Sequence, residues 1–419
     1  MSTSFSTRRV CPTWWAIHSH RARRCRRSSR WSTTERPSRR RAHCGLREPP
    51  AGIFGARRRQ GRRALPRGRG NLAERVYLDW NATAPLRPEA RVAMAEAMDV
   101  VGNPSSVHAE GRAARALVER ARAQVAAALG ALSADIVFTS GATEAAALAL
   151  AGRGLAGSGV EHDAVKAWAE PSLAVDGQGR VAVAEPGRAT LQLANSETGV
   201  VQELPEGLAV SDLTQGFGKV PFAFDWSGVE AGFVSAHKIG GPKGVGALVL
   251  KRGTDLPAQI RGGGQEMGRR SGTENIVGIA GFGAAAEAAA RDLAAGVWDR
   301  VAELRNILEI SLDVCEKEII LVGDSAPRLP NTTCLAVPGW KGETQVMQMD
   351  LAGFAISAGS ACSSGKARSS GVLEAMGYAP DVARGAIRVS LGPGVTEDEV
   401  RRFAGTWRAR LEKFRARAA

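Results

Sequence analysis

The sequence predicts an α/β protein whose large domain has a mostly parallel β-sheet covered by helices, joined to a smaller α+β domain. Three observations predict this fold. Short apolar runs of strand length alternate with Ala-rich amphipathic stretches of helix length from Val76 onward. The body of about 350 residues that follows the first seventy is long enough for one large and one smaller domain. No run of roughly eighteen apolar residues occurs, so no membrane partner is expected.

Residues 1–70 have a different composition from the rest of the chain. They hold 20 Arg, no Lys and two acidic residues, a net charge of +18, whereas the remainder carries 36 basic against 40 acidic residues. The net charge of +14 therefore belongs to this segment, and the mildly acidic body gives no reason to expect a nucleic-acid partner. The segment lacks helical or strand periodicity and is expected to have no fold. Three interpretations remain open: a basic arm for nucleic acid or anionic lipid, a transit peptide, or translated upstream DNA, which the lack of Lys favours.

The elements of the large domain follow in order. Residues 90–131 predict amphipathic helices around a Gly-Asn-Pro-Ser-Ser loop. Residues 135–139 predict a buried strand, and the small-residue turn and Ala/Leu helix after it form a potential anion site at a helix N-terminus. The nine residues between Gln202 and Asp212 are too few for a crossover with its helix, so that helix is expected to be missing. Further strands are expected at 190–194, 222–224, 232–235 and 245–250.

Beyond about residue 285 the pattern predicts one long helix, which reaches to about residue 312, and then a smaller domain with strands at 334–337 and 387–390. The predicted boundaries are thus 91–285 for the large domain, and 71–90 with 286–419 for the small one. The body contains three cysteines without paired spacing, which argues against a disulfide framework and against a metal site. Such cysteine usage fits a reducing compartment, and we expect a cytoplasmic protein.

Lys238 is the first residue that points to chemistry. It ends an apolar strand in Ser-Ala-His-Lys and precedes a Gly-Gly-Pro-Lys-Gly turn. A surface turn lysine is one interpretation, but a desolvated lysine can also form a Schiff base with a carbonyl cofactor. Pyridoxal 5'-phosphate would further require a phosphate cradle, a carboxylate for its ring nitrogen, a ring cover and an anchor for the substrate carboxylate. The sequence offers candidates for all four: the turn at 141–143, Asp212, His162 and Arg388.

The body resembles the cysteine desulfurases of the NifS/IscS type, within the fold-type I, class V aminotransferase superfamily. The resemblance covers nearly all of it, from Tyr77 to Arg388 and beyond. It rests on motifs that occur in the family's order: Tyr-Leu-Asp-Trp-Asn-Ala-Thr-Ala-Pro at 77–85, Gly-Asn-Pro-Ser-Ser-Val-His at 102–108, Ser-Gly-Ala-Thr-Glu at 140–144, Asn-Ser-Glu-Thr-Gly-Val at 195–200, Ser-Ala-His-Lys at 235–238, Gly-Gly-Gly-Gln-Glu at 262–266, Arg-Ser-Gly-Thr-Glu-Asn at 270–275 and Ser-Ala-Cys-Ser-Ser-Gly at 360–365.

The resemblance implies a pyridoxal-phosphate enzyme that converts L-cysteine to L-alanine. Lys238 would bind the cofactor covalently, Asp212 would hold the ring nitrogen protonated, and Gln215 would hydrogen-bond the phenolic oxygen. His162 would stack on the ring and assist proton transfers, and Arg388 would bind the substrate carboxylate through a bidentate pair. The phosphate would be held by Ala142, Thr143, Ser235 and His237, with Thr273 from the second subunit of a homodimer.

One position departs from the family pattern. Ser196 stands where the family has a second asparagine that contacts cofactor and substrate. Asn195 is therefore expected to supply that contact.

Cys362 selects the activity within the superfamily. Residues 357–371 contain six Ser, three Gly and three Ala, which predicts a mobile loop. Lys366 and Arg368 lie near Cys362 in the chain and favour its thiolate, whereas Cys315 and Cys334 suit structural roles. The resemblance implies that Cys362 receives sulfur as a persulfide and passes it to an acceptor protein, either an iron–sulfur scaffold or a thiolation enzyme.

Two other functions stay open from the sequence. One is a selenocysteine lyase or another class V aminotransferase-like enzyme without the persulfide step. The other is a degenerate binding protein that keeps the fold without turnover, which Ser196 and the shortened crossovers would suit.

Overall fold

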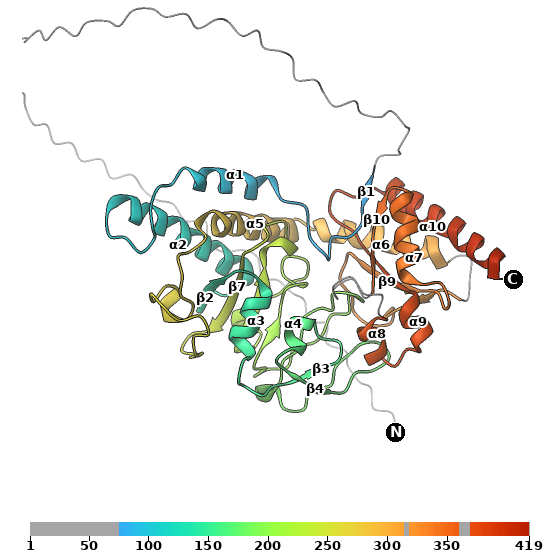
Figure 1. Ribbon diagram of the computed structural model, residues 1–419, viewed down its shortest axis with the longest axis horizontal. Coiled ribbons are helices and arrows are strands. Elements are labelled where there is room, and N and C mark those ends of the chain that lie inside the picture. The colour runs from blue at the N-terminus through green and yellow to red at the C-terminus, as the bar shows by residue number, and fades with distance from the viewer. Residues whose placement is uncertain (1–74, 314–317, 360–368, 419) are drawn as a thin grey trace, which may run out of the picture. The chain divides into compact units, whose positions relative to one another are not determined.

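The computed structural model describes residues 75–313, 318–359 and 369–418 (Figure 1). Its α-helices are α1 (Pro88–Met98), α2 (Ala109–Leu129), α3 (Ala142–Leu150), α4 (Asp163–Lys166), α5 (Ile276–Ala294), α6 (Val297–Asp313), α7 (Gly342–Leu351), α8 (Gly371–Ala375), α9 (Pro380–Gly385) and α10 (Glu397–Ala418). Its strands are β1 (Val76–Tyr77), β2 (Ala134–Thr139), β3 (Ala156–Ser158), β4 (Glu170–Leu173), β5 (Ser211–Asp212), β6 (Ala231–Ser235), β7 (Gly246–Lys251), β8 (Ile320–Leu321), β9 (Thr332–Ala336), β10 (Phe354–Ala355), β11 (Ser357–Ala358) and β12 (Ala386–Ser390). None of the helices in these ranges has the length and apolar character needed to cross a bilayer.

The large sheet has the strand order β2-β7-β6-β5. β5 pairs with β6 in parallel, and β7 runs antiparallel to both of its neighbours. The sheet continues beyond β5 through residues 189–193, because Leu191 N donates to Val210 O and Thr190 N donates to Ala156 O. There it reaches the parallel pair β3 and β4. The prediction of a mostly parallel α/β sheet is confirmed, and β7 is the antiparallel exception among these strands.

Side chains on successive positions of the large sheet enter two different cores, as the period of two in a strand requires. Ile136 and Phe138 of β2 pack into the core under α2 and α5, while Val137 between them packs into the core under α3. Figure 1 shows α1, α2 and α5 on one side of this sheet and α3 on the other. Because both faces of the sheet are buried, the sequences of its strands are continuous apolar runs.

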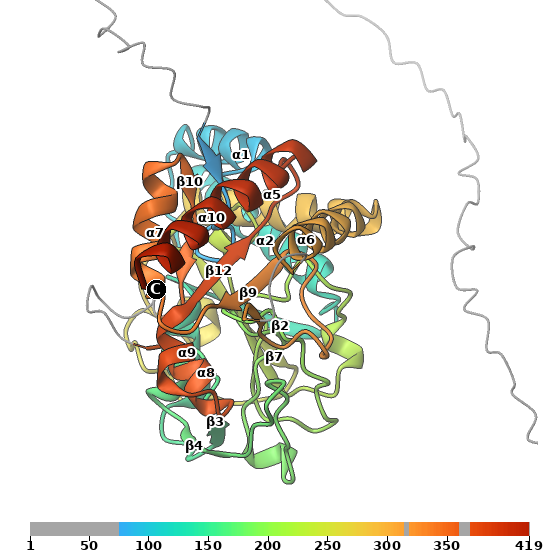
Figure 2. The same cartoon turned by 90° about the vertical axis from the view of Figure 1, so that its right-hand side faces the viewer.

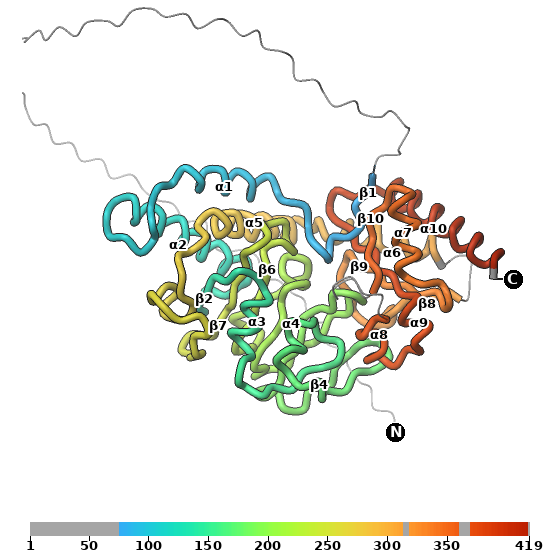
Figure 3. The backbone as a smooth tube through the Cα atoms, viewed as in Figure 1, coloured from blue at the N-terminus to red at the C-terminus, as the bar shows by residue number. Residues whose placement is uncertain are grey.

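A second sheet is antiparallel, with the strand order β11-β12-β9-β8, and has α7 and α10 beside it (Figure 2). Ile387 and Val389 of β12 pack into a core with Trp340 and Trp407. Arg388 lies between them in the strand and therefore faces the opposite side. The tube view shows β1 beside β10, and this parallel pair brings residues 79–83 to the edge of the large sheet (Figure 3).

Three sequence predictions need correction. Residues 222–224 do not form a strand, because Phe224–Trp226 form a 3-10 turn with Phe224 buried in the core. The long helix is two helices, α5 and α6, since Gly296 adopts φ +71° between them. The predicted loop 357–371 begins in β11 and ends in α8, so small residues at its margins pair with a strand edge and start a helix. Residues 203–210 contain no helix, which confirms the shortened crossover.

Candidate active site

A cavity of about 590 Å³ lies at the edge where β2, β5 and β6 end. Strands that run parallel bring their carboxyl ends to one edge of a sheet, where ligands commonly bind. The lining contains eight residues that the sequence predicted for a cofactor site: Ala142, Thr143, His162, Asp212, Gln215, Ser235, His237 and Lys238. Residues separated by almost one hundred positions thus meet in one cavity.

The first turn of α3 forms one end of this cavity. Gly141, at the helix N-terminus, makes no side-chain cap, so the first N–H groups of α3 are available to a ligand anion. A Cβ at Gly246 would lie 2.6 Å from Val234 O and 2.8 Å from Gly141 Cα. Only glycine at that position therefore allows β7 to pack directly against the turn.

Two lysines, a histidine and a serine lie near the same end of the cavity. Ser235, His237, Lys238 and Lys243 all contribute to its lining. Burial, together with the charges of Lys238 and Lys243, lowers the pKa of His237 to about 4. At neutral pH the imidazole of His237 is uncharged, so the positive charge near the α3 N-terminus comes from the lysines.

The amine of Lys238 is held by backbone carbonyls. Lys238 ends a 3-10 turn, Ala236–Lys238, directly after β6. Its Nζ donates to Asn81 O at 2.6 Å and to Ala82 O at 3.0 Å. The end of β6 and the segment that contains Asn81 and Ala82 therefore fix the position of Lys238 Nζ together.

Asp212 and His162 are placed by the ends of β5 and β3. Burial raises the pKa of Asp212, while the hydrogen bond from Thr214 and the nearby charge of His162 lower it in part. His162 caps α4, and its Nδ1 accepts from Ala164 N at 3.1 Å. An acceptor at Nδ1 puts the proton of the uncharged ring on Nε2. A buried carboxyl with a raised pKa is a site that a cationic ligand group would stabilise.

Asn195 does not line the cavity, and its predicted contact with cofactor and substrate stays a prediction. Its Nδ2 donates to Val160 O, and its Oδ1 accepts from the backbone N–H groups of Glu197 and Thr198. The amide is used to close the turn after residue 194, and Ser196 lines the cavity instead.

Arg388 lies next to this cavity without lining it. Its Nη2 donates to Asp79 Oδ1 at 2.7 Å, and its Nη1 donates to the carbonyl of Ser196 at 3.0 Å. The side chain is 3% exposed, and its Nε is buried without a hydrogen-bond partner among the described residues. Asp79 also accepts from Ser357, which orients the carboxylate.

Asp79 is a functional candidate that the sequence reasoning missed. The rule that a buried arginine needs a partner could have found it, because Asp79 is the acidic residue of the Tyr-Leu-Asp motif. Asn81, two residues later, was also missed, since an asparagine beside an alanine gives no signal of its seven hydrogen bonds.

Two predicted residues lie elsewhere. Thr273 lines a separate cavity of about 170 Å³ that shares Ser140 and Gly244 with the larger one, and its role across a dimer stays a prediction. Cys362 lies outside the described residues, as does Cys315. Cys334 is fully buried, and burial raises the pKa of its thiol, which suits a structural role.

Two buried acids lie between the cavity and the ends of the undescribed segment 360–368. Glu161 and Glu197 line a small cavity of about 60 Å³, whose other lining residues include His162, Gly359, Ser369, Gly371 and Val372. Burial raises the pKa of Glu161 to about 8 and that of Glu197 to about 7. Both groups are therefore able to carry a proton near neutral pH.

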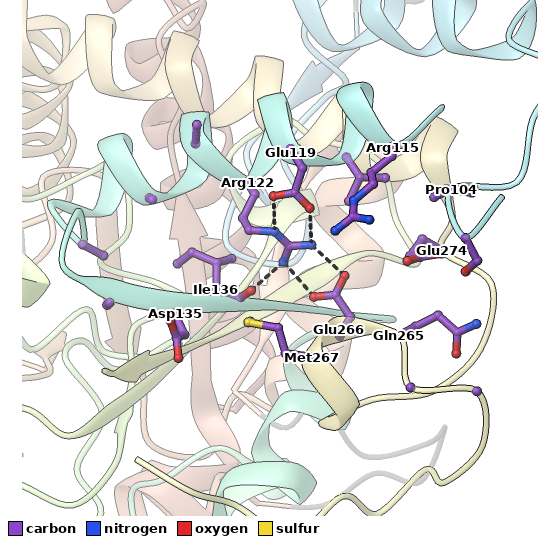
Figure 4. A pocket seen from close by; sticks show the side chains of 18 of the residues that line it. Pro104, Arg115, Glu119, Arg122, Asp135, Ile136, Gln265, Glu266, Met267 and Glu274 are labelled. Carbon is purple, nitrogen blue, oxygen red and sulfur yellow. Dashed lines mark hydrogen bonds and ion pairs between the residues drawn. The ribbon is translucent and has the colours of Figure 1, made fainter. Parts of the chain in front are cut away.

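A cavity of about 700 Å³ beside α2 contains none of the predicted residues (Figure 4). At its centre Arg122 donates to both carboxylate oxygens of Glu266, at 2.7 and 2.9 Å, and to Ile136 O. Glu266 also accepts from Phe138 N. Because these charges already satisfy one another, the geometry indicates a structural ion pair rather than a reactive site.

Comparison with known proteins gives consistent results. Residues 76–169 and 187–403 match the family described as aminotransferase class-V. A cysteine desulfurase from Cereibacter sphaeroides is 39% identical over 381 residues, which cover 82% of this chain and 97% of that protein. A NifS-like protein from Rickettsia africae has a similar structure, with a TM-score of 0.73, 30% identity and coverage of 81% and 100% of the two chains. A structure described as SspA in complex with cysteine has a TM-score of 0.63 and 27% identity, and covers 76% and 99%.

Proposed function

This chain belongs to the class-V aminotransferases and, among them, to the cysteine desulfurase family, and we propose that it converts L-cysteine to L-alanine with transfer of the sulfur to Cys362. The observation that carries the proposal is the single cavity that unites the Lys238 amine, the Asp212 carboxyl and the N-terminus of α3. Enzymes of this family are generally dependent on pyridoxal phosphate, and the cavity residues fit that cofactor.

The fit rests on two parts of the cavity, one suited to the phosphate and one to the ring nitrogen. The first turn of α3, with Ser235 and the nearby lysines, suits a phosphate. Asp212 is buried with a raised pKa and would be stabilised by a protonated ring nitrogen. When bound, pyridoxal phosphate supplies a carbonyl carbon for amines and a ring that withdraws electrons from the α-carbon of the substrate.

The residues of the chain would divide the remaining work. Arg388 is held by Asp79 through Nη2. It would bind the substrate carboxylate through guanidinium N–H groups that make no hydrogen bond within the described residues, such as that of Nε. Lys238 would accept the α-proton at Nζ, with the carbonyls of Asn81 and Ala82 directing the amine. His162 would cover the ring from the start of α4, and Gln215, which lines the same cavity, would donate a hydrogen bond to the phenolic oxygen.

In the sulfur step, the sulfur atom of the substrate would be transferred to the thiolate of Cys362. The Cys362 thiolate would form a bond to the substrate sulfur while the carbon–sulfur bond breaks and leaves its electron pair on the carbon fragment. Protonation of that fragment gives alanine, so one L-cysteine and one Cys362 thiol yield one L-alanine and one persulfide. An acceptor protein with a free thiol would then take the sulfur, and Thr273 of a second subunit would complete the phosphate site. A thiolate nucleophile requires reducing conditions, and we therefore place the enzyme in the cytoplasm.

The test uses the full chain loaded with pyridoxal phosphate and supplied with L-cysteine. Alanine and protein-bound persulfide are measured together, and both should appear in equal amounts in the first turnover. Lys238→Ala should form neither product, and Cys362→Ala should form no persulfide. Background alanine from the loaded wild type would refute the function. Full sulfide release by Cys362→Ala would favour a class-V enzyme without the persulfide step.

A further inference from the structure

Lys219 is a buried amine to which the proposed mechanism gives no role. It follows β5 in a tight turn where Lys219 N donates to Gly216 O. Gly218, with φ +70°, packs against Ala289 at the back of this turn, where a Cβ would approach to 2.9 Å. The turn directs the Lys219 side chain inward, and the residue is 3% exposed. It does not line the main cavity, so it lies behind the wall formed by Gln215.

The hydrogen bonds of Lys219 go to two uncharged acceptors. Its Nζ donates to Gln215 Oε1 at 2.9 Å and to Asn81 Oδ1 at 3.2 Å. No salt bridge joins Lys219 to a carboxylate within the described ranges. An ammonium has three N–H donors and an uncharged amine has two, so two acceptors match the uncharged form in this buried position.

The electrostatic surroundings favour the same form. Burial holds the pKa of the Lys219 amine well below its usual value, and the positive charges of Lys238 and Arg388 lower it further. A charge on Lys219 would add a third cation to this side of the site without a counter-ion. Desolvation of such an unpaired charge is costly.

The two acceptors connect Lys219 to residues of the candidate site. Because Gln215 Oε1 is engaged by Lys219, the amide must present its Nε2, which donates to Asn81 O at 2.9 Å. The same carbonyl holds Lys238 Nζ. Asn81 Nδ2 donates to the carbonyl of Ser196, which also accepts from Arg388. A change at Lys219 therefore reaches both residues proposed to act on the substrate.

We propose that Lys219 is a positioning residue that works as an uncharged amine: it fixes the amide orientation of Gln215, so that an N–H faces the cavity, and it braces Asn81, on which the Lys238 amine rests. This role rests on the proposed function, since it serves the same cavity. It assigns to Lys219 no contact with substrate or cofactor. The chain has nine lysines, and this one is distinguished by full burial without an acidic partner among the described residues.

The first measurement counts protons. The full chain is unfolded in denaturant at pH 8, and the protons taken up are measured by potentiometric titration. An amine that is uncharged in the folded chain and charged in the unfolded chain takes up about one proton, so wild type should exceed Lys219→Met by about one. The matched control is Lys251→Met, at an exposed strand end, which should equal wild type. Equal uptake by wild type and Lys219→Met would overturn the uncharged amine.

The second measurement reports positioning without turnover. Equilibrium dialysis of the full chain gives the dissociation constant of pyridoxal phosphate, which should rise about tenfold in Lys219→Met, because Gln215 Oε1 loses its donor. Lys219→Gln, which keeps N–H donors without a charge, should recover most of this affinity and also serves if the Met variant does not fold. Wild-type affinity in Lys219→Met, or no recovery in Lys219→Gln, would overturn the positioning role. Neither readout depends on alanine formation, so a failure of the proposed function would be seen separately.

Discussion

The ion pair between Arg388 and Asp79 gives a prediction whose size can be worked from the structure. Arg388 is 3% exposed at its side chain and Asp79 is 16% exposed, and Nη2 lies 2.7 Å from Oδ1. In Asp79→Asn the guanidinium would stay buried without its carboxylate, and the Ser196 carbonyl would be its remaining uncharged hydrogen-bond partner among the described residues. Removal of one member of a buried pair costs roughly 3–5 kcal/mol, and the partial exposure of Asp79 puts the expected loss near the lower limit, about 3 kcal/mol.

Thermal unfolding measures this loss. For a chain of this size, 1 kcal/mol corresponds to about 2 °C in Tm, so Asp79→Asn should unfold roughly 6 °C below wild type. The control is Ser357→Ala, which removes the second hydrogen bond to Asp79 but keeps the pair, and should lower Tm by no more than about 2 °C.

A carboxylate ligand adds a second readout. L-alanine, the proposed product, would supply negative charge to the unpaired guanidinium, so its stabilising effect should be larger in Asp79→Asn than in wild type. The reasoning would be refuted by a Tm of Asp79→Asn equal to that of Ser357→Ala, or by an equal effect of L-alanine on Asp79→Asn and wild type.

Three further predictions follow from the site. Burial raises the pKa of Glu197 from 4.5 to about 7. The stability contributed by the protonated carboxyl is therefore fully present at pH values below 4.5 and is lost as the pH rises through 7. The unfolding free energy of wild type relative to Glu197→Gln should therefore fall by about 2.5 kcal/mol between pH 5 and pH 8 in urea titrations, and a constant difference would contradict the assignment. Gly246→Ala should weaken pyridoxal phosphate at least tenfold (about 1.4 kcal/mol), because the new Cβ would clash with the turn before α3, whereas Gly394→Ala meets no atom within 4 Å and should bind as wild type in the same dialysis. His237 has a pKa of about 4 and stays uncharged above pH 6, so His237→Gln should leave the pH dependence of cofactor affinity unchanged between pH 6 and pH 8, and a pH step present only in wild type would show that the imidazole titrates there.

Much of the fold could be predicted because it depends on local patterns. The strand at 134–139 and the helix after it follow from an apolar run, a small-residue turn and an Ala/Leu stretch. The break at Gly296 was missed because one glycine between two helical patterns is tolerated in many helices. The 3-10 turn at Phe224–Trp226 was missed because a short apolar run with two aromatic residues has the composition of a strand.

Some residues of the candidate site could likewise be predicted from local sequence patterns, and others could not. Lys238, Asp212 and His162 could be named because each follows an apolar strand, and parallel strands end at one edge of a sheet. The turn-closing hydrogen bonds of Asn195 could not be predicted, since the residue type alone does not reveal whether an amide faces a cavity or closes its own turn.

The residue types of the site could be predicted from the sequence, because motifs and strand ends are local patterns of neighbouring residues. The tertiary structure alone decided how they are held. Asp79 and Arg388 are 309 positions apart, and Lys219 meets Asn81 across 138, so no local pattern reports either contact. Burial then sets their charge states, since the cost of desolvation depends on every group packed around a side chain.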